Sequence, residues 1–145
     1  MNIATILASK GAHVVTIGPD ATIREALRLL AACNIGALVV TAAGQARPVG
    51  IVSERDIVRA LARDEGVLSR PVSTIMTSEV VVGSPQDDVA AVGHTMTEKR
   101  IRHLPVMERG RLVGIVSIGD IVKAQRDQYQ GEVDTLQLQL LKPSA

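Results

Sequence analysis

Two serine–aspartate pairs with the same spacing are the residues of this chain best suited to chemistry. Ser53 and Asp56 lie in "GIVSERDIVRA", and Ser117 and Asp120 lie in "GIVSIGDIVKA". A serine at a helix start can cap free backbone N–H groups, and an acid three residues later is favoured by the helix dipole. The same geometry can hold a ligand, because the N–H groups suit a phosphate and the carboxylate can accept both hydroxyls of a ribose.

A nucleotide would also need close backbone approach and an apolar slot for its base. Gly50 and Gly114 precede the two serines, and their lack of a side chain would let the backbone approach a ligand. Because the chain has no Phe or Trp, the base would have to lie between aliphatic side chains. The candidates are Ile17, Ile35, Ile51, Val82, Ile101 and Ile115, although such residues more often belong simply to the core.

Both motifs belong to an internal repeat that covers most of the chain. Shifting the sequence aligns Pro19 with Pro85 and Gly44 with Gly110, and a shift shorter by two residues aligns 49–60 with 113–124. Two copies are too few for a solenoid, so a pair of units related by a pseudo-two-fold axis is the natural packing.

Hydrophobic period and turn residues predict the order β-α-β-β-α in each copy. In the first copy the predicted elements are a strand at 13–17, a helix at 22–33, strands at 36–41 and 48–53, and a helix at 53–63. In the second they are a strand at 79–82, a helix at 87–99, strands at 103–107 and 112–117, and a helix from 117 that continues into the tail. We therefore expect an α/β fold with these parts: an N-terminal segment (1–12), a first repeat (13–66), a linker (67–78), a second repeat (79–125) and a helical tail (126–145).

The two copies differ in charge near the start of the strand that follows the first helix. The second copy has cation-capable side chains where the first has uncharged ones: Arg100, Arg102 and His103 against Asn34, Gly36 and Ala37. Such a cluster suits a phosphate, or it forms a charged edge that discourages strand pairing. Arg55 stands where the second motif has Gly119, and it could reach a phosphate or simply coat its helix. We expect two non-equivalent sites.

Composition argues against several classes of protein. A net charge of +1 and a single aromatic residue, Tyr129, argue against nucleic-acid binding. No apolar run is long enough to cross a bilayer, and "MNIATILASKG" lacks the features of a secretion signal. With one cysteine, Cys33, the chain can form no internal disulfide, so we expect a cytoplasmic protein. The histidines are scattered and no phosphate-binding glycine loop is present, so we expect no enzyme and no metal site.

The chain resembles a tandem pair of CBS domains, also called a Bateman module. The resemblance rests on the element order, the paired "GIVS-x-x-D-I-V" endings, the "IGALVV" and "IRHLPV" strands and the "VSTIMT" linker, and it covers about 13–125. It implies that the serine–aspartate motif is an adenosine-binding element whose aspartate holds the ribose. The ligand-binding set that it implies is Ile17, Ile35, Gly36, Ala37, Gly50, Ile51, Ser53, Arg55, Asp56, Val82, Ile101, Arg102, His103, Leu104, Pro105, Gly114, Ile115, Ser117 and Asp120.

The resemblance also implies a function. We expect a regulatory homodimer that binds AMP, ADP, ATP, NAD(H) or S-adenosylmethionine in the clefts between the repeats, with AMP or ATP and NAD(H) favoured by the basic cluster. No catalytic cofactor is expected, and any output would pass through an unidentified effector protein. The alternative is an interaction or structural module with no nucleotide ligand.

Overall fold

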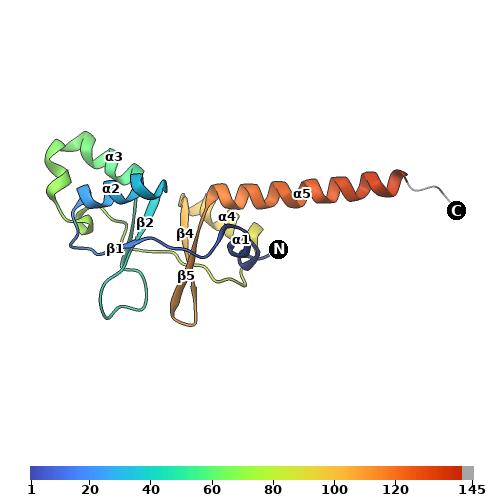
Figure 1. Cartoon of the computed structure of the whole chain (residues 1–145), viewed down its shortest axis with the longest axis horizontal. Coiled ribbons are helices and arrows are strands. Elements are labelled where there is room, and N and C mark those ends of the chain that lie inside the picture. The colour runs from blue at the N-terminus through green and yellow to red at the C-terminus, as the bar shows by residue number, and fades with distance from the viewer. Residues whose placement is uncertain (142–145) are drawn as a thin grey trace.

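The computed structural model describes residues 1–141, which form two α/β lobes followed by a long helix (Figure 1). The first lobe contains β1 (Thr16–Ile17), α2 (Ile23–Cys33), β2 (Ala37–Val40), β3 (Gly50–Ser53) and α3 (Glu54–Arg63). The second lobe contains α1 (Ile3–Lys10), α4 (Val89–Lys99), β4 (His103–Glu108), β5 (Arg111–Ser117) and the start of α5 (Ile118–Leu141). The 3-10 helices η1 (Glu65–Ser69) and η2 (Val72–Thr74) lie between them in the chain. The predicted α/β fold of two repeats is confirmed.

Short polar motifs set the ends of α2 and α4, which are equivalent helices of the two repeats. Thr22 caps α2 by accepting from the Glu25 N–H at 3.1 Å, while the Glu25 carboxylate accepts from the Thr22 N–H at 3.0 Å. Asp88 caps α4 by accepting from the Ala91 N–H at 3.1 Å. Both helices end in a left-handed residue, Asn34 at φ 52° and Arg100 at φ 55°. Because these interactions are local, they can be anticipated from spacing alone.

The two sheets are unequal, and one predicted strand is wrong. The first lobe has a sheet in the order β1-β2-β3, with β1 parallel to β2 and β2 antiparallel to β3, whereas the second has only the antiparallel pair β4-β5. Residues 79–82, predicted as a strand, form none, and a single bridge joins the next residue, Gly83, to Val106. The cause is Pro105, which stands where Val39 stands in the first lobe. Val39 donates its N–H to Val15, and proline has no N–H to donate.

Each lobe has its own core, and a segment from outside the predicted repeat completes it. In the second lobe α1 contributes Ile3, Ile6 and Leu7, which pack with buried residues of α4, β4, β5 and α5. In the first lobe η1 and η2 contribute Val67 and Val72. The N-terminal helix and the linker therefore occupy equivalent places, although the predicted boundaries left both outside the repeats.

The backbone contacts of these two segments are equivalent as well. Pro71 makes an isolated bridge with the helix cap Thr22, and Asn2 makes the corresponding bridge with the helix cap Asp88. The match is visible in the sequence, because "IATILA" at 3–8 resembles "VSTIMT" at 72–77.

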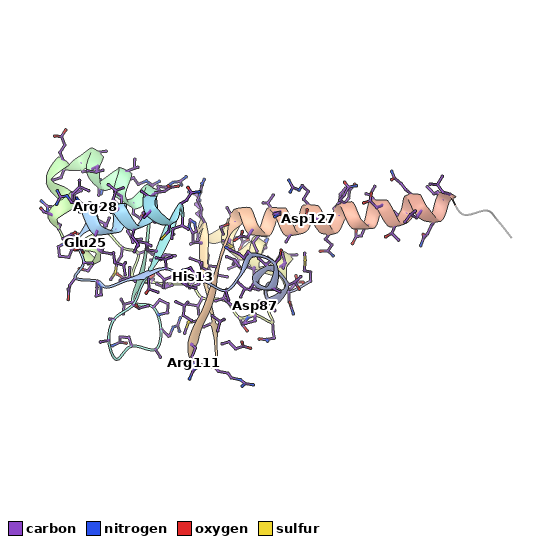
Figure 2. The ribbon with its side chains drawn as sticks, viewed as in Figure 1. His13, Glu25, Arg28, Asp87, Arg111 and Asp127 are labelled. Atoms are coloured by element: carbon purple, nitrogen blue, oxygen red, sulfur yellow. The ribbon has the colours of Figure 1, made fainter. Side chains whose placement is uncertain are left out.

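The long helix α5 projects beyond the lobes (Figure 1), and its side chains stand out on both sides of this projecting part (Figure 2). Ile121 is buried against the second core, whereas Leu136 and Leu140 are exposed. The helix runs through Gly131 without a break. The predicted tail is helical as far as Leu141, and its last part, 142–145, lies outside the described residues. Within residues 1–141, none of the helices is long and apolar enough to span a membrane.

Candidate functional site

The first serine–aspartate motif forms a capping box at the start of α3. Ser53 Oγ accepts from the Asp56 N–H at 3.2 Å, and Asp56 Oδ2 accepts from the Ser53 N–H at 2.8 Å. Asp56 Oδ2 also accepts from the Ser53 hydroxyl at 3.0 Å. The interpretation as a helix start is therefore confirmed for this motif. The box uses one carboxylate oxygen and leaves Oδ1 without a donor from residues 1–141.

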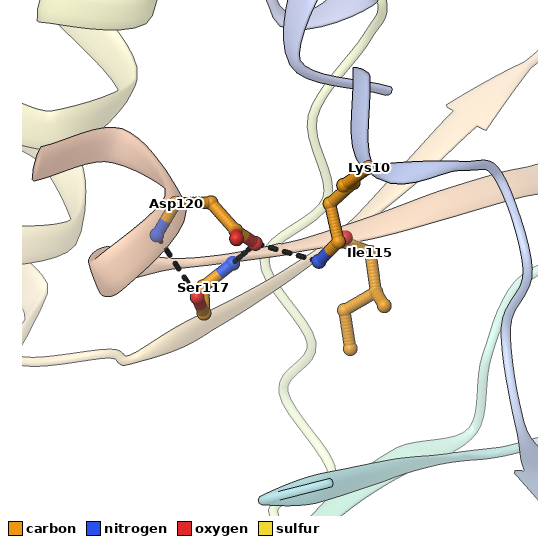
Figure 3. Close-up of polar contacts among 4 residues, drawn as sticks. All are labelled: Lys10, Ile115, Ser117 and Asp120. Carbon is orange, nitrogen blue, oxygen red and sulfur yellow. Dashed lines mark hydrogen bonds and ion pairs between the residues drawn. The ribbon is translucent and has the colours of Figure 1, made fainter. Parts of the chain in front are cut away.

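The second motif repeats this geometry and adds a charged partner. Ser117 Oγ accepts from the Asp120 N–H at 3.1 Å, and Asp120 Oδ2 accepts from the Ser117 N–H at 2.8 Å. Lys10, the last residue of α1, places Nζ 2.6 Å from Asp120 Oδ2 and 3.0 Å from the carbonyl oxygen of Ile115 (Figure 3). The ion pair is partly exposed, with 35% of the Lys10 side chain and 24% of the Asp120 side chain accessible.

The sequence did not predict Lys10 as a site residue, because Lys10 lies far along the chain from the motif that it contacts. A signal was nevertheless present. Aligning "IATILA" with "VSTIMT" places Lys10 at the position that Glu79 holds after the first repeat. The two aligned positions therefore carry residues of opposite charge.

The protonation of Asp120 follows from these contacts. Burial by itself would raise the pKa of the Asp120 carboxyl, but the hydrogen bonds from Lys10 and Ser117 and the positive charge of Lys10 outweigh it. The net result is a pKa below the ordinary value, so Asp120 is a carboxylate at neutral pH. A carboxylate accepts hydrogen bonds and donates none, as the recognition of ribose hydroxyls requires.

In the first lobe, backbone occupies the place that Lys10 takes in the second. Ile51 and Thr77 exchange two backbone hydrogen bonds, of 3.0 Å and 2.9 Å, along the outer edge of β3. Ile51 corresponds to Ile115, whose carbonyl instead receives the ammonium of Lys10. The edge beside the first motif is thus closed by main chain, and the edge beside the second by a side chain.

At both predicted glycines, Gly50 and Gly114, the space that a Cβ would occupy is filled by a neighbouring side chain. A Cβ on Gly114 would lie 2.6 Å from Leu7 Cδ2, and a Cβ on Gly50 would overlap the Met76 side chain. These residues come from α1 and from the linker, which are the segments that complete the two cores. A side chain at either glycine would therefore displace the neighbouring Leu7 or Met76 side chain, whatever the glycine backbones contact on the other face.

The two lobes contact each other at His103, the last residue of the basic cluster. A Cβ built on Gly36 would lie 3.4 Å from His103 Nε2 and 3.6 Å from Glu54 Oε1, so β4 of the second lobe lies against the first lobe here. Burial lowers the pKa of His103 most and the charge of Lys10 lowers it further, while Glu54 and Asp120 oppose these effects. Since the net pKa lies below the ordinary 6.5, His103 is neutral at neutral pH. His103 also pairs with Ser117 across β4 and β5.

The other predicted site residues divide by exposure. Arg55 and Arg102 are exposed, and neither makes an ion pair with another residue of the described chain. Buried members of the predicted set are Ala37, Leu104 and Pro105. Half-buried aliphatic members are Ile17, Ile35, Ile51, Val82, Ile101 and Ile115. The half-buried group keeps part of its surface available for a base.

A separate hollow of about 310 Å³ lies beside α4, away from both motifs. Its lining includes Val82 and Leu104 from the predicted set, together with Asp87, Asp88 and Thr95, but neither Ser117 nor Asp120. We place the candidate site at Asp120 rather than here, because a serine cap, a carboxylate and the ammonium of Lys10 meet at that motif. Within residues 1–141, no three His, Cys, Asp or Glu side chains gather in a way that could hold a metal ion.

The fold and site define a two-repeat α/β module with one serine–aspartate cap in each repeat. The chain belongs to the CBS-domain family, because the family model for the CBS domain matches residues 7–63 and again 72–127. The first match reaches into α1.

Relatives at the sequence level are CBS-domain proteins. The chain is 35% identical over 121 residues to the mitochondrial CBS domain-containing protein CBSX3 of Arabidopsis thaliana, covering 81% of this chain and 59% of that protein. It is 34% identical over 113 residues to the CBS domain-containing protein YhcV of Bacillus subtilis, covering 78% of this chain and 79% of the relative. The chain thus spans less than two thirds of CBSX3.

Solved structures with the same fold include ligand complexes. The CBS-domain protein ATU1752 from Agrobacterium tumefaciens has a TM-score of 0.82 at 44% identity, over 86% of this chain and 99% of that one. PAE2072 from Pyrobaculum aerophilum, in complex with AMP, has a TM-score of 0.74 at 35% identity, over 83% and 89%. The CBS pair of protein MJ0100, in complex with 5-methylthioadenosine and S-adenosyl-L-methionine, has a TM-score of 0.78 at 27% identity, over 88% and 98%.

Proposed function

We propose that this protein is a regulatory module that binds an adenosine-containing ligand without chemical conversion, in the clefts beside Asp56 and Asp120. The observation that carries the proposal is the arrangement at Asp120, where a carboxylate with a free Oδ1 lies among Lys10, Ser117 and His103. A carboxylate beside a capped helix start suits ribose hydroxyls, and the neighbouring ammonium of Lys10 suits a phosphate. That PAE2072 is found with AMP, and MJ0100 with S-adenosylmethionine, supports the same ligand class.

AMP, ATP and NAD(H) are the ligands we favour, with ADP and S-adenosylmethionine as further members of the class. Each joins an adenosine to a charged group. Arg102 is exposed and precedes His103, and its carbonyl accepts from the Ile118 N–H beside the second motif. Ligand binding would act by shifting the population between two arrangements of the repeats, provided that the ligand prefers one of them. An effector protein would then respond to that arrangement.

A homodimer is part of the proposal. Val58 of α3 and Val122 of α5 occupy equivalent positions in the two repeats, and they are 64% and 58% exposed. Apolar side chains exposed at corresponding places on both lobes would be covered when two copies associate. Sedimentation of wild type beside Val58→Asp tests this, and a monomeric wild type would exclude it.

Thermal unfolding with a panel of adenosine compounds tests the proposed ligand class. At 100 times Kd a ligand of the native state stabilises by about 2.7 kcal/mol, which corresponds to several degrees for a domain of this size. Asp56→Asn and Asp120→Asn should each reduce the shift, and the double variant should abolish it. Asp88→Asn, a matched change at a helix cap beside the hollow on α4, should leave the shift intact.

Each outcome of the thermal-unfolding panel points to a different function or site. No shift with any adenosine compound would reject nucleotide binding and favour an interaction module, for which the exposed leucines Leu136, Leu138 and Leu140 on α5 provide a surface. A shift that survives in the double variant but disappears in Asp88→Asn would move the site to the hollow.

A further inference from the structure

Asp56 and Asp120 accept their second hydrogen bond from different kinds of donor. A carboxylate oxygen has about two lone-pair directions. In both motifs Oδ2 uses one of them for the serine backbone N–H. Asp56 uses the other for the Ser53 hydroxyl, whereas Asp120 uses it for the ammonium of Lys10. The two clefts therefore differ at the group that a ribose would contact.

These two donors do not yield equally to a ligand. A serine hydroxyl can turn toward another acceptor by rotation about one bond, with little change in charge. Moving the ammonium of Lys10 away from Asp120 separates opposite charges that are only 2.6 Å apart. A ribose that uses both of its hydroxyls needs Oδ2 as well as Oδ1. In the second cleft it therefore competes with an ion pair, whereas in the first it competes with a serine hydroxyl.

Only the Lys10 side chain needs to move, because the helix that carries it is fixed. Ile3, Ile6 and Leu7 of α1 are 0%, 6% and 9% exposed in the second core. The Lys10 side chain is partly accessible to solvent, so it can swing without unpacking α1. An ammonium released in this way stays beside the cleft, near Arg102 and His103. Its positive charge there would be matched best by an anionic group on the ligand.

We propose that Lys10 makes the second cleft selective for anionic adenosine compounds, because the ribose displaces its ammonium from Asp120 and the anionic group binds the ammonium in return. The inference rests on the proposed function. The first lobe has the backbone bridge between Ile51 and Thr77 in place of the lysine, so the first cleft should distinguish charged from neutral adenosine compounds less strongly.

Calorimetric titration with adenosine and with AMP tests the inference. All variants carry Asp56→Asn, so that only the second cleft is measured. In this background Lys10→Met should bind adenosine about twofold to fivefold more tightly, the range expected for removing a partly exposed ion pair. The preference for AMP over adenosine should fall by about fivefold or more. Lys10→Arg should keep the parent's preference, since it restores the cation.

Lys123→Met is the matched control, because it removes the same charge from an exposed position on α5 that makes no ion pair with the described residues. It should behave as the parent. Lys10→Gln serves as a second neutral variant if Lys10→Met changes the fold, which circular dichroism reports.

The possible results separate this inference from the proposed function. If the parent binds but Lys10→Met binds adenosine no more tightly, the competition is overturned and nucleotide binding stands. The same holds if Lys123→Met reproduces the effect, because the change would then follow from net charge. If neither the variants nor the wild-type protein binds adenosine or AMP, the proposed function fails and the inference fails with it.

Discussion

Leu7 of α1 packs directly on Gly114 of β5, so closely that a Cβ on the glycine would lie 2.6 Å from Leu7 Cδ2 and 2.9 Å from Cδ1. Met76 has the same relationship to Gly50 in the other lobe. Each contact joins a strand to the segment that closes its core. The two glycines therefore let α1 and the linker pack closely on the lobes.

Gly114→Ala should destabilise the protein by about 1–3 kcal/mol, because the added methyl forces the branched end of Leu7 to move within a packed core. Gly50→Ala should cost less, since Met76 is unbranched and can adjust its rotamers more easily. Urea unfolding of the two variants measures both differences.

Gly18→Ala is the control for these substitutions. A Cβ at Gly18 would have no neighbour within 4 Å, and its backbone is outside the left-handed region, so this change should be neutral or slightly stabilising. Equal losses at Gly18 and Gly114 would contradict the packing argument.

Arg100 ends α4 in a left-handed conformation that is unfavourable for a residue with a Cβ. Arg100→Gly should stabilise the protein by about 0.5–1 kcal/mol, because glycine is the residue preferred at this position. Lys99→Gly, one residue earlier and still helical, should instead destabilise by about 1 kcal/mol. Thermal unfolding of the pair checks the opposite signs, and equal signs would show that the left-handed turn carries no strain.

His103 should make stability depend on pH. Its folded pKa lies below 6.5, so as the pH falls through 6.5 the unfolded state takes up a proton before the folded state does. Stability should therefore decrease below pH 6.5 and level off below the folded pKa. The groups that face the ring are Lys10, Glu54, Arg102 and Asp120.

Urea midpoints measured between about pH 8 and pH 5 test this dependence. His103→Gln should flatten the part of the profile just below pH 6.5, whereas His13→Gln, at an exposed position, should leave it unchanged. A wild-type profile identical to that of His103→Gln would contradict the assignment.

The far part of α5 should contribute little to the stability of the lobes. From Gln125 to Leu141 only Val133 is even half-buried, and the buried residue of the helix, Ile121, lies near its start. Deleting 129–145 should change the free energy of unfolding by less than about 0.5 kcal/mol, as expected for removing exposed side chains. A larger loss that depends on protein concentration would show that another copy covers the helix.

Much of the fold could be predicted because the interactions behind it are local. The capping boxes at Thr22 and Ser53 join residues three apart, and hydrophobic period identified the helices that follow them. The failed strand at 79–82 had a sequence cause in Pro105, but its effect appears only once the pairing partner is known. The helix at 3–10 was not predicted, although its similarity to the linker was present in the sequence.

The sequence by itself determined that two equivalent serine–aspartate caps exist, since each cap depends on a few neighbouring residues. Only the tertiary structure decided which segment completes each lobe and which groups surround each aspartate. Lys10 and Asp120 are 110 residues apart in the chain and 2.6 Å apart in space. Their contact depends on where α1 packs, and that depends on the apolar side chains of α1 fitting the second core rather than on any spacing in the sequence.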